Sequence, residues 1–375
     1  MLLTAPFSVW MGGALHMFVD MYSKVIMIYV LALNVTSSPR RVERFTWVLV
    51  LSVSYIALLT VINYVRGVDV IMHGARVRGA VGGVMQNPND LALNMVSFLP
   101  LAAFVVMRPG SFGRRAVAAG CVLLMVATTV ATDSRGGFLG FAAMMLVLGT
   151  FAVRRRPGFV VAGVLAALCM LPIVPQHYWV RLASITNEKL DQTGSEQARR
   201  ELMKESFQAF LQNPLTGVGA GQFVNWAPDE REQAAHEAHD VFLQVAADLG
   251  IVGLGVFVFL IGRAFFVVYQ TRRFIRGLRR RRARAPTSTR ANTDAMPFDE
   301  QAIELLDAHS AAMAAALTGW LVCAVFASVA YNWTFYYLLA LAVTPCEMLR
   351  DRQPARTRAR GARVGVAVAP EAARA

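Results

Sequence analysis

Long apolar blocks without a single charge limit what this chain can fold into. Phe45–Val65 and Ser310–Cys346 contain no Asp, Glu, Lys or Arg. Such blocks cannot form a surface in contact with water, whereas a helix that crosses a membrane needs about 20 apolar residues. The composition agrees, because 56% of residues are hydrophobic and 16% are charged, against about 25% charged in soluble domains. The sequence therefore predicts an all-α, polytopic transmembrane helix bundle.

Nine segments have the length and apolar content of a membrane-spanning helix. The block Ser310–Cys346 is too long for one crossing. We divide it at Tyr331-Asn332-Trp333, a polar and aromatic stretch suited to a tight turn at the membrane interface. The nine predicted spans lie at roughly 15–35, 45–65, 89–107, 116–132, 137–153, 158–175, 243–268, 310–330 and 333–349.

The polar segments between the spans divide the chain. Residues 1–175 hold the N-terminal transmembrane helices, 176–242 form one large loop, and 243–349 hold the C-terminal transmembrane helices. The tail 350–375 is expected to be disordered. Segment 271–309 is rich in Arg and then in Pro, Ser and Thr. It is predicted to contact anionic lipids and to continue as a flexible linker, although a role limited to setting the topology fits it equally well.

The basic residues are distributed unequally between the two sets of loops. The chain has 37 Lys and Arg against 24 Asp and Glu, a net charge of +13. One set of alternate loops, together with the tail, holds 25 of the basic residues, and the other set holds 10. Because Lys and Arg retain loops in the cytoplasm, the first set is predicted to be cytoplasmic and the large loop to lie outside. This places the N-terminus outside, so we expect further helices to precede it. The loop positions of these charges argue against nucleic acid as a partner.

The large loop carries most of the exposed polar chemistry. Its segment Ser195–Gln212 has apolar residues at helical spacing with Arg199 and Arg200 among them, which predicts an amphipathic helix near the membrane surface. A glycine-rich turn follows. The amides of Gly217 and Gly219 can approach an anion, and a tight structural turn is an equally good interpretation.

Two histidines stand near the end of the loop. His236 and His239 have the spacing of two metal ligands on one helical face. Because no third ligand cluster accompanies them, and the four cysteines lie in apolar blocks without a CxxC motif, we expect neither a metal nor another cofactor. A general base facing an anionic substrate competes with a merely interfacial histidine.

Two further outside segments contain candidate binding residues. Arg76 and Arg78 precede the string Asn87-Pro88-Asn89, and Ser134-Arg135-Gly136-Gly137 joins two short spans. Arginine at a membrane boundary is costly and is often functional. A structural ion pair with Asp133 is the alternative for Arg135.

These strings, in this order, resemble the O-antigen ligase and polymerase family of bacterial envelope glycan biosynthesis. The resemblance covers about residues 15–350. The matching strings are Arg78 with Asn87-Pro88-Asn89; Ser134-Arg135-Gly136-Gly137; Arg199 with Asn213-Pro214-Leu215-Thr216-Gly217-Val218-Gly219; Ala238-His239-Asp240-Val241-Phe242-Leu243; and Asp248-Leu249-Gly250-Ile251-Val252-Gly253.

The resemblance implies a multi-pass protein of the bacterial inner membrane whose active site faces the periplasm. It implies a metal-independent glycosyltransferase that takes a glycan from undecaprenyl pyrophosphate. The acceptor would be lipid A-core, another glycan or a protein, with membrane lipids as further partners. By position, His239 matches the family histidine, Arg199 the arginine of the loop helix, and Arg78 (or Arg76) the arginine ahead of Asn-Pro-Asn. Asp240 stands where the family usually has Asn.

The residue chemistry fits this reaction. Arginine neutralises a pyrophosphate leaving group bidentately without a metal, and histidine can deprotonate an acceptor hydroxyl near neutral pH. We expect Arg78, Arg199 and His239 to be catalytic, with Arg78, Arg135 and Arg199 holding the pyrophosphate. The expected substrate-binding residues are Arg76, Arg135, Arg200, Asn89, Gly217 and Gly219.

Other functional classes fit the sequence less well. A transporter or flippase of lipid-linked glycan would place binding residues at the membrane midplane and show repeated hydropathy. The main in-span charges, Asp20, Lys24 and Arg263, are scattered instead. A sensor or scaffold would need a cytoplasmic output domain, and 271–309 is too short and polar to form a core.

Overall fold

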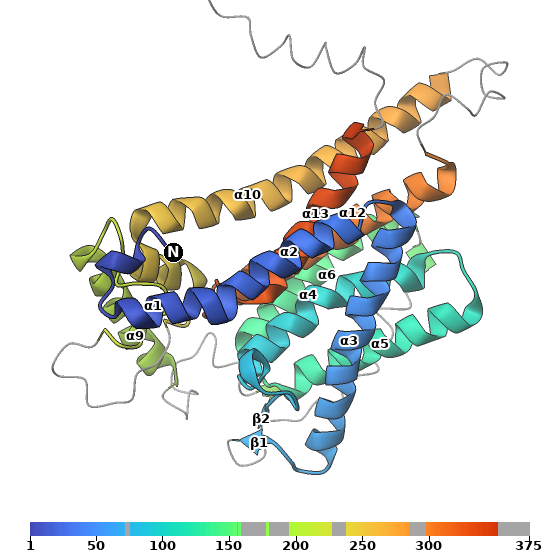
Figure 1. The fold of residues 1–375 in the computed structure, drawn as a ribbon. Coiled ribbons are helices and arrows are strands. Elements are labelled where there is room, and N and C mark those ends of the chain that lie inside the picture. The colour runs from blue at the N-terminus through green and yellow to red at the C-terminus, as the bar shows by residue number, and fades with distance from the viewer. Residues whose placement is uncertain are drawn as a thin grey trace, which may run out of the picture.

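The computed structural model describes residues 1–71, 76–155, 157–158, 178–179, 195–226, 238–284 and 298–351. Within these ranges the chain is mainly α-helical, as predicted, with a few short turns and one pair of two-residue strands (Figure 1). The helices are α1 (Met11–His16), α2 (Ser23–Val35), α3 (Pro39–Val65), α4 (Pro88–Met107), α5 (Phe112–Ala131), α6 (Arg135–Arg155), α9 (Ser195–Gln212), α10 (Val241–Arg284), α12 (Glu300–Ala324) and α13 (Trp333–Asp351). A π-helical segment, Met17–Tyr22, joins α1 to α2, short 3₁₀ turns cover Ala5–Phe7 and Gly83–Met85, and the strands are β1 (Val70–Ile71) and β2 (Arg76–Val77).

Seven helices in the described part of the chain are long and apolar enough to cross a membrane. They correspond to seven of the nine predicted spans, with ends that differ by several residues. The predicted span 158–175 falls almost wholly outside the described residues. The predicted span 333–349 is helical in α13, but α13 is not among the seven. The seven are Met11–Val35, Pro39–Val65, Pro88–Met107, Phe112–Ala131, Arg135–Val153, Val241–Arg280 and Glu300–Ala324.

Helix α4 forms the centre of the bundle. In the most apolar stretch of α4, 83% of the residues are buried inside the protein. The helix packs against α5, α12, α6 and α3. Helices α6 and α12 also pack closely on each other. A Cβ on Gly140 would meet Cys323 Sγ at 2.2 Å and the Gly319 carbonyl oxygen at 2.9 Å. Small residues at such a crossing let two helix backbones approach, which fixes the start of α6 against the end of α12.

The string Asn87-Pro88-Asn89 forms the N-terminus of α4. The Asn87 side chain accepts the Asn89 N–H at 2.9 Å, and Pro88 occupies the first helical turn. Asn is a favoured N-cap, and Pro fits at N1 because that amide needs no intrahelical partner. The cap therefore leaves the Asn89 side chain available for contacts outside its own helix.

Helix α10 is interrupted once and then extends far past the bundle. Gly250 has φ 66° and ψ −167°, so the element consists of one helix before Gly250 and another after it. The second helix has 34 residues from Ile251 to Arg284, a length of about 50 Å that exceeds the roughly 30 Å hydrocarbon core. Segment 271–309 is helical at both of its ends, because α10 continues to Arg284 and α12 begins at Glu300. Its Pro-, Ser- and Thr-rich part, where a flexible linker is predicted, lies mostly outside the described residues.

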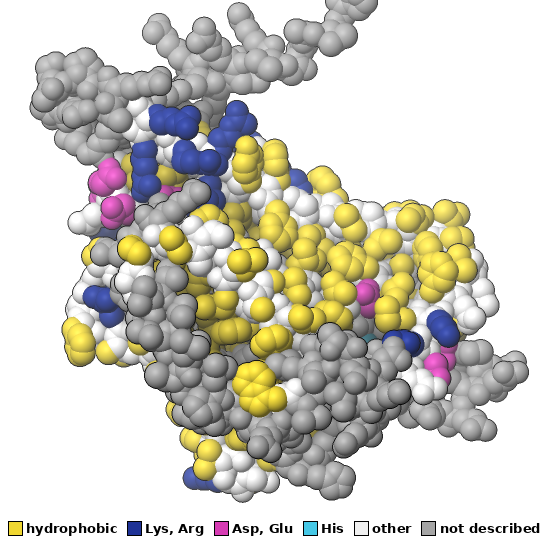
Figure 2. Space-filling view, turned by 180° about the vertical axis from the view of Figure 1, so that it is seen from behind, with side chains coloured by type: hydrophobic (Ala, Val, Ile, Leu, Met, Phe, Trp, Pro, Cys, Tyr) yellow, Lys and Arg dark blue, Asp and Glu magenta, His cyan; other side chains and the backbone are white. Residues whose placement is uncertain are grey.

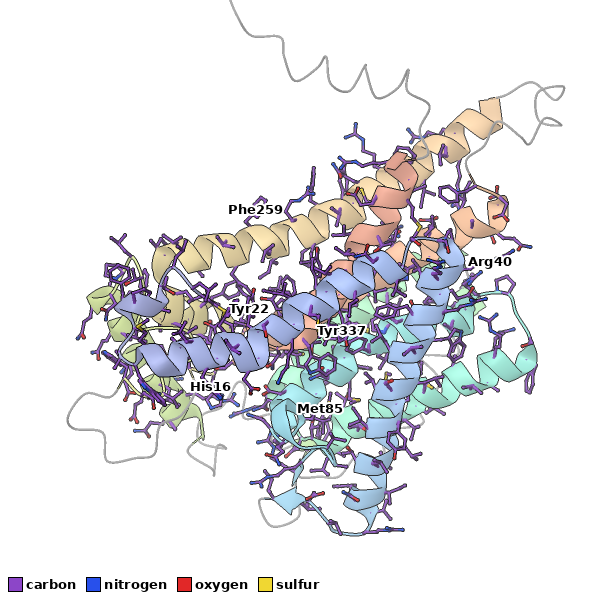
Figure 3. The ribbon with its side chains drawn as sticks, in the orientation of Figure 1. His16, Tyr22, Arg40, Met85, Phe259 and Tyr337 are labelled. Atoms are coloured by element: carbon purple, nitrogen blue, oxygen red, sulfur yellow. The ribbon has the colours of Figure 1, made fainter. Side chains whose placement is uncertain are left out.

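The two ends of the bundle differ in charge. Lys and Arg gather mainly at one end of the face in Figure 2, next to an apolar surface. This arginine-rich end holds the end of α10, the starts of α3, α5 and α12, and the end of α13 (Figure 1). There Asp307, on α12, pairs with Arg279 at 2.9 Å and lies 3.9 Å from Arg272. Phe259 in the middle of α10 points away from the bundle (Figure 3) and is 63% exposed, as a lipid-facing residue would be. The hairpin β1–β2, α9 and the start of α10 lie at the opposite end.

Candidate functional site

Three of the family-like residues form a buried polar cluster at the end opposite the arginine-rich end. Arg76 Nη2 donates to Asn89 Oδ1 at 3.0 Å, and Ser134 Oγ donates to the same oxygen at 2.8 Å. Arg76 Nε also donates to the Thr132 carbonyl at 3.0 Å. Charged groups are buried only when they are well hydrogen-bonded, and Arg76 is 6% exposed. Residues from β2, α4 and the start of α6 are thereby held in one place.

The hairpin separates the two candidate arginines that precede α4. Strands β1 and β2 pair antiparallel, with Val70 opposite Val77 and Ile71 opposite Arg76. Arg78 directly follows β2, and its N–H donates to the Asp69 carbonyl at 2.9 Å. In a regular strand, residues two apart point to the same face. Here β2 ends at Val77, so Arg78 does not follow that rule: Arg76 is buried, whereas the Arg78 side chain is exposed. Of the two alternatives for the family arginine, Arg76 is the one that joins the cluster with Asn89.

The loop between α12 and α13, residues 325–332, connects the predicted strings to one another. A Cβ on Gly136 would lie 2.9 Å from Phe326 Cβ, so the Ser134–Gly137 string packs directly on this loop. Ser328 Oγ accepts the His239 N–H at 2.8 Å. The chain turns here between α12 and α13, where the sequence predicts a tight turn, and Tyr331 and Asn332 are each only 4% exposed. The loop is an internal support for the site.

His239 lies in a constrained backbone conformation next to a helix cap. Its φ of 54° is in the left-handed region, which non-glycine residues adopt at a cost of about 1 kcal/mol or more and which occurs often at functional sites. Asp240 Oδ1 then accepts the N–H groups of Phe242 and Leu243, both at 2.8 Å, and so caps α10. Burial raises the pKa of Asp240 above its ordinary value, and the two backbone hydrogen bonds offset part of that rise. The backbone of His239 is thus fixed by its hydrogen bond to Ser328 on one side and by the Asp240 cap of α10 on the other, and its side chain is half-buried.

The glycine-rich turn wraps around the first part of α10. The Gly221 and Phe223 N–H groups donate to the Asp248 carboxylate at 3.0 and 3.1 Å, and the Gly219 N–H donates to the Asp248 carbonyl at 2.9 Å. The Gly217 N–H donates to the Asn213 carbonyl at 2.9 Å. The structure therefore gives the amides of Gly217 and Gly219 acceptors within the protein. This geometry fits the structural turn, one of the two interpretations of these glycines. Their contact with a substrate anion stays a prediction.

The same turn explains why glycines are needed. Gly217 has φ 68°, and a Cβ there would lie 2.3 Å from the Asp248 carbonyl carbon. Gly250, with φ 66°, would place a Cβ 2.5 Å from the backbone of Leu215. The Ile251 N–H, released by the helix break at Gly250, donates to the Pro214 carbonyl at 2.8 Å. The turn and the interrupted helix therefore require each other.

A buried tyrosine completes the support around Asp248. The Tyr331 hydroxyl donates to Asp248 Oδ2 at 2.9 Å. Burial and the Asp248 charge raise the pKa of Tyr331 well above its ordinary value, so the hydroxyl stays a donor. Gln244, one turn earlier on α10, accepts the Ala330 N–H at 3.1 Å. The loop 325–332 thus binds both His239 and the helix that follows it.

Helix α9 brings Arg199 towards the bundle and Arg200 away from it. The helix packs on α10, and its Ser206 and Ala209 are fully buried. Arg199 precedes Ser206 by seven residues, which places both on one helical face, and it is half-buried, whereas Arg200 is exposed. The exposed stripe of α9 carries Met203, Phe207 and Leu211. The amphipathic helix predicted for Ser195–Gln212 is confirmed.

Tyr178 lies beside the start of α6, close to the polar cluster of Arg76, Asn89 and Ser134. Its ring meets Phe138 edge to face, with centroids 6.5 Å apart. Burial and the nearby Asp133 carboxylate raise the pKa of Tyr178 to about 12. Asp133 itself has φ 49°. Strained and buried polar groups therefore flank Arg135 as well, whose own side chain is half-buried.

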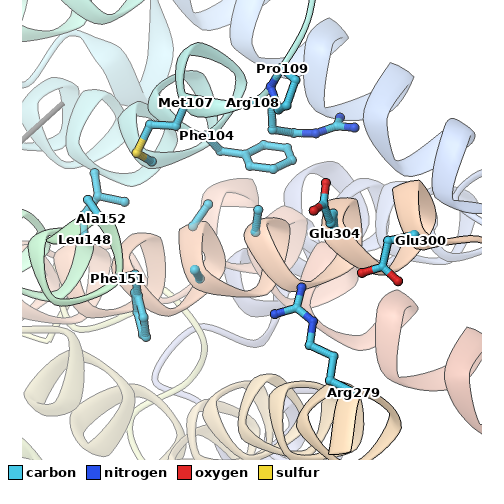
Figure 4. Close-up of a pocket in the computed structure, with 13 residues that line it drawn as sticks. Phe104, Met107, Arg108, Pro109, Leu148, Phe151, Ala152, Arg279, Glu300 and Glu304 are labelled. Atoms are coloured by element: carbon cyan, nitrogen blue, oxygen red, sulfur yellow. The ribbon is translucent and has the colours of Figure 1, made fainter. Parts of the chain in front are cut away.

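A cavity of about 390 Å³ lies elsewhere, at the arginine-rich end, and takes no part in this site (Figure 4). Phe104, Arg108, Phe151, Arg279 and Glu304 are among its lining residues. None of the predicted site residues lines it. In the part of the chain that the structure describes, no group of three or more His, Cys, Asp or Glu side chains has the arrangement of a metal site. His236, which has the spacing of a second metal ligand to His239, is outside the described residues.

Several supporting residues were missed by sequence reasoning. Asp248, Ser328 and Tyr331 received no role, although an acidic residue inside an apolar span signals a buried function or partner. Nothing local in the sequence marks Ser328, and Tyr331 was noted only as part of the turn that divides two spans. Their importance comes from contacts to residues more than eighty positions away.

The comparisons with known proteins agree with these strings. Residues 120–258 match the family described as O-antigen ligase. No curated protein matches the chain significantly. The matched range includes the Ser134–Gly137 string, Arg199, the glycine-rich turn and His239, while Arg76, Asn89 and the loop 325–332 lie outside it. The match therefore supports the resemblance to the O-antigen ligase family over residues 120–258 of this chain.

Proposed function

We propose that this protein transfers a glycan from an undecaprenyl pyrophosphate carrier to an acceptor hydroxyl at the periplasmic face of a bacterial inner membrane. The family match over residues 120–258 supports glycosyl transfer of the ligase or polymerase type. The donor, the side of the membrane and the residue roles are the proposal. The acceptor is lipid A-core, a second glycan or a protein.

One observation supports a single site more than any other. The loop 325–332 packs on Gly136, and its Ser328 hydroxyl accepts the His239 N–H. Ser134, two residues before Gly136, donates a hydrogen bond to Asn89 Oδ1, which also accepts one from Arg76. Strings that are more than 150 residues apart are therefore linked through direct contacts. Such a convergence of arginine, asparagine and histidine suits an anionic, sugar-bearing substrate.

The reaction we propose is a direct displacement at the anomeric carbon. The acceptor oxygen forms a bond to that carbon as the bond from carbon to the pyrophosphate oxygen breaks, which inverts the configuration. His239 accepts the acceptor's proton, and the electron pair of the broken bond leaves with undecaprenyl pyrophosphate. Arg78, Arg135 and Arg199 bind the pyrophosphate and neutralise the charge that develops on it, a contribution that is often the largest in catalysis. Arg76 and Asn89 position this set.

The test is transfer by the purified full-length protein in lipid nanodiscs, with an undecaprenyl pyrophosphate-linked oligosaccharide as donor. Lipid A-core, a repeat-unit glycan and a pilin-type protein are supplied as acceptors in separate reactions. We expect product with one acceptor class, and a fall of about 10²–10⁴-fold in rate for His239→Ala. His16→Ala is the matched control, because His16 is an exposed histidine on α1 that contributes to no proposed step, and it should stay within about twofold of the wild type.

The outcomes separate the possible errors. Transfer that persists unchanged in His239→Ala would exclude His239 as the base. A folded wild-type protein that transfers to none of the three acceptors, but moves labelled donor across a sealed vesicle membrane, would replace the transferase with a flippase. Arg199→Lys keeps the charge but not the bidentate geometry, so a loss of rate in that variant would support pyrophosphate binding by a planar guanidinium.

A further inference from the structure

Two helices begin at the arginine-rich end with arginines where acidic residues are favoured. Helix α3 carries Arg40 and Arg44 near its start, and α5 carries Arg114; neither helix has an acidic residue in its first turn. The N-terminus of a helix has a partial positive charge, so cations there are unfavourable and anions are favourable. Arg40 and Arg44 are also four residues apart on one face, where like charges repel. This local arrangement would be relieved by an anion.

These arginines line a hollow of about 370 Å³ between the starts of α3 and α5. Its lining residues are Arg40, Glu43, Arg44, Trp47 and Arg114. Figure 3 shows Arg40 at the start of α3, where α2 and α3 meet. The hollow is separate from the cavity of Figure 4 and from every residue of the proposed transfer site.

The acidic residue of the hollow is already engaged. Glu43 Oε1 accepts from Arg108 Nη1 at 2.9 Å and also from Arg114 Nη2. Within the described ranges, neither Arg40 nor Arg44 forms an ion pair, and both side chains are exposed. The Arg114 guanidinium also lies 5.8 Å from the centre of the Trp47 ring. Arg40 and Arg44 can therefore bind an anion, next to Arg114, whose side chain is held in place by Glu43 and Trp47.

An apolar stripe continues from the hollow along α3. Trp47 follows Arg40 and Arg44 at helical spacing, and the same face continues into the middle of the span. No other described helix covers it, since its large residues remain exposed: Val48 57%, Leu51 47%, Tyr55 61% and Leu58 41%. Trp at a membrane interface sits at the level of the lipid headgroups. The hollow therefore lies at headgroup level, with a lipid-facing surface next to it.

We propose that this hollow binds the phosphate headgroup of an anionic phospholipid from the leaflet that borders the arginine-rich end. Arg40, Arg44 and Arg114 contact the phosphate, Trp47 packs on the glycerol region, and the acyl chains follow the stripe from Val48 to Leu58. Basic pockets between transmembrane helices are suited to such headgroups. The lipid would join α3 to α5 at a place where the protein alone leaves like charges together.

The experiment measures phosphatidylglycerol retained by the purified full-length protein, with native mass spectrometry and with titration into phosphatidylcholine nanodiscs. The test variant is Arg40→Gln/Arg44→Gln. The matched control is Arg41→Gln/Arg115→Gln, which also removes two charges, one from α3 and one from α5. It leaves the lining of the hollow unchanged, because Arg41 bonds to Ser37 and Arg115 to the Val106 carbonyl. We expect the test variant to bind phosphatidylglycerol about thirtyfold more weakly, which equals about 2 kcal/mol. The control should match the wild type within about threefold.

Three further readouts make the outcome decisive. Single Arg44→Gln should weaken binding about fivefold, so the proposal is tested even if the double variant does not fold. The soluble headgroup, glycerol phosphate, should bind far more weakly than the lipid; equal affinity would identify a site for a free phosphate compound and overturn the lipid assignment. If the test and control variants lost the same amount of phosphatidylglycerol binding, the lipid would be attracted by net charge alone and the proposed site would be wrong. Wild-type binding of phosphatidylglycerol by the test variant would also overturn the site.

Discussion

Replacing Tyr331 by Phe probes the support beneath His239 with the loss of one oxygen atom. The Tyr331 hydroxyl donates to the buried Asp248 carboxylate at 2.9 Å, and the same carboxylate accepts the Gly221 and Phe223 amides. A hydrogen bond to a charged group contributes about 1.5–3 kcal/mol, and a buried acceptor that loses its donor costs a similar amount. Because Phe keeps the ring and its packing, we expect Tyr331→Phe to lower the free energy of unfolding by about 1.5–3 kcal/mol.

Tyr336→Phe is the matched control for this prediction. Tyr336 is also buried, but its hydroxyl meets neutral partners, Tyr22 Oη at 2.9 Å and the Ala330 carbonyl at 3.3 Å. Its loss should therefore cost only about 0.5–1.5 kcal/mol. Unfolding is followed in detergent by intrinsic fluorescence, and amide exchange in a peptide spanning 217–226 reports on the glycine-rich turn. Faster exchange there should appear in Tyr331→Phe and not in Tyr336→Phe. The reasoning is refuted if Tyr331→Phe is no less stable than the control, or if exchange in that peptide does not change.

Further predictions concern the turn, the cap and the buried cluster. Gly217→Ala should unfold at a temperature several degrees lower than Gly67→Ala, because both positions have φ near 68° but only Gly217 lacks room for a Cβ. Asp240→Ala should lose about 1 kcal/mol of stability by removing the α10 cap, whereas Asp240→Asn keeps it. Burial raises the pKa of Asp240 above its ordinary value of 3.8, so between these two pKa values the folded protein holds a proton that the unfolded chain has released. The wild type should therefore lose stability as the pH rises from 3.8 through the raised pKa, and Asp240→Asn should not. Thermal unfolding measured across this pH range checks the difference. Arg76→Gln should cost about 3–5 kcal/mol or prevent folding, whereas the exposed Arg78→Gln should unfold like the wild type within about 0.5 kcal/mol.

The sequence was sufficient for those features that depend on local pattern. Uncharged blocks such as Phe45–Val65 predict spanning helices because only an α-helix satisfies its own backbone inside a membrane. The amphipathic spacing of Ser195–Gln212 likewise predicts α9. The order of the family strings predicts which residues belong near one site, and the contacts of Asn89 and Ser134 agree with that.

Features set by distant contacts were beyond local reasoning. Gly250 lies in an apolar run that the sequence predicts to be one continuous helix. The break at Gly250 depends on a distant acceptor, the Pro214 carbonyl, which accepts the Ile251 N–H. The separation of Arg76 from Arg78 depends on how the hairpin meets α4, which spacing alone does not fix. Composition did not predict that the Arg-rich segment after 271 continues α10, because the pairing of Arg279 with Asp307, on another helix, favours continued helix there.

The central claim is that the Arg76 cluster, α9 and His239 face the periplasm, opposite the arginine-rich end. Side-specific labelling of single cysteines tests it most directly, in a background whose native cysteines are replaced by alanine. Gln212→Cys, at the exposed end of α9, and Gly110→Cys, which has open space around it in the loop before α5, mark the two ends. A membrane-impermeant maleimide added to intact spheroplasts should label position 212 and spare position 110 until the membrane is permeabilised. Labelling of position 110 with protection of position 212 would place His239 on the cytoplasmic side and contradict periplasmic glycan transfer.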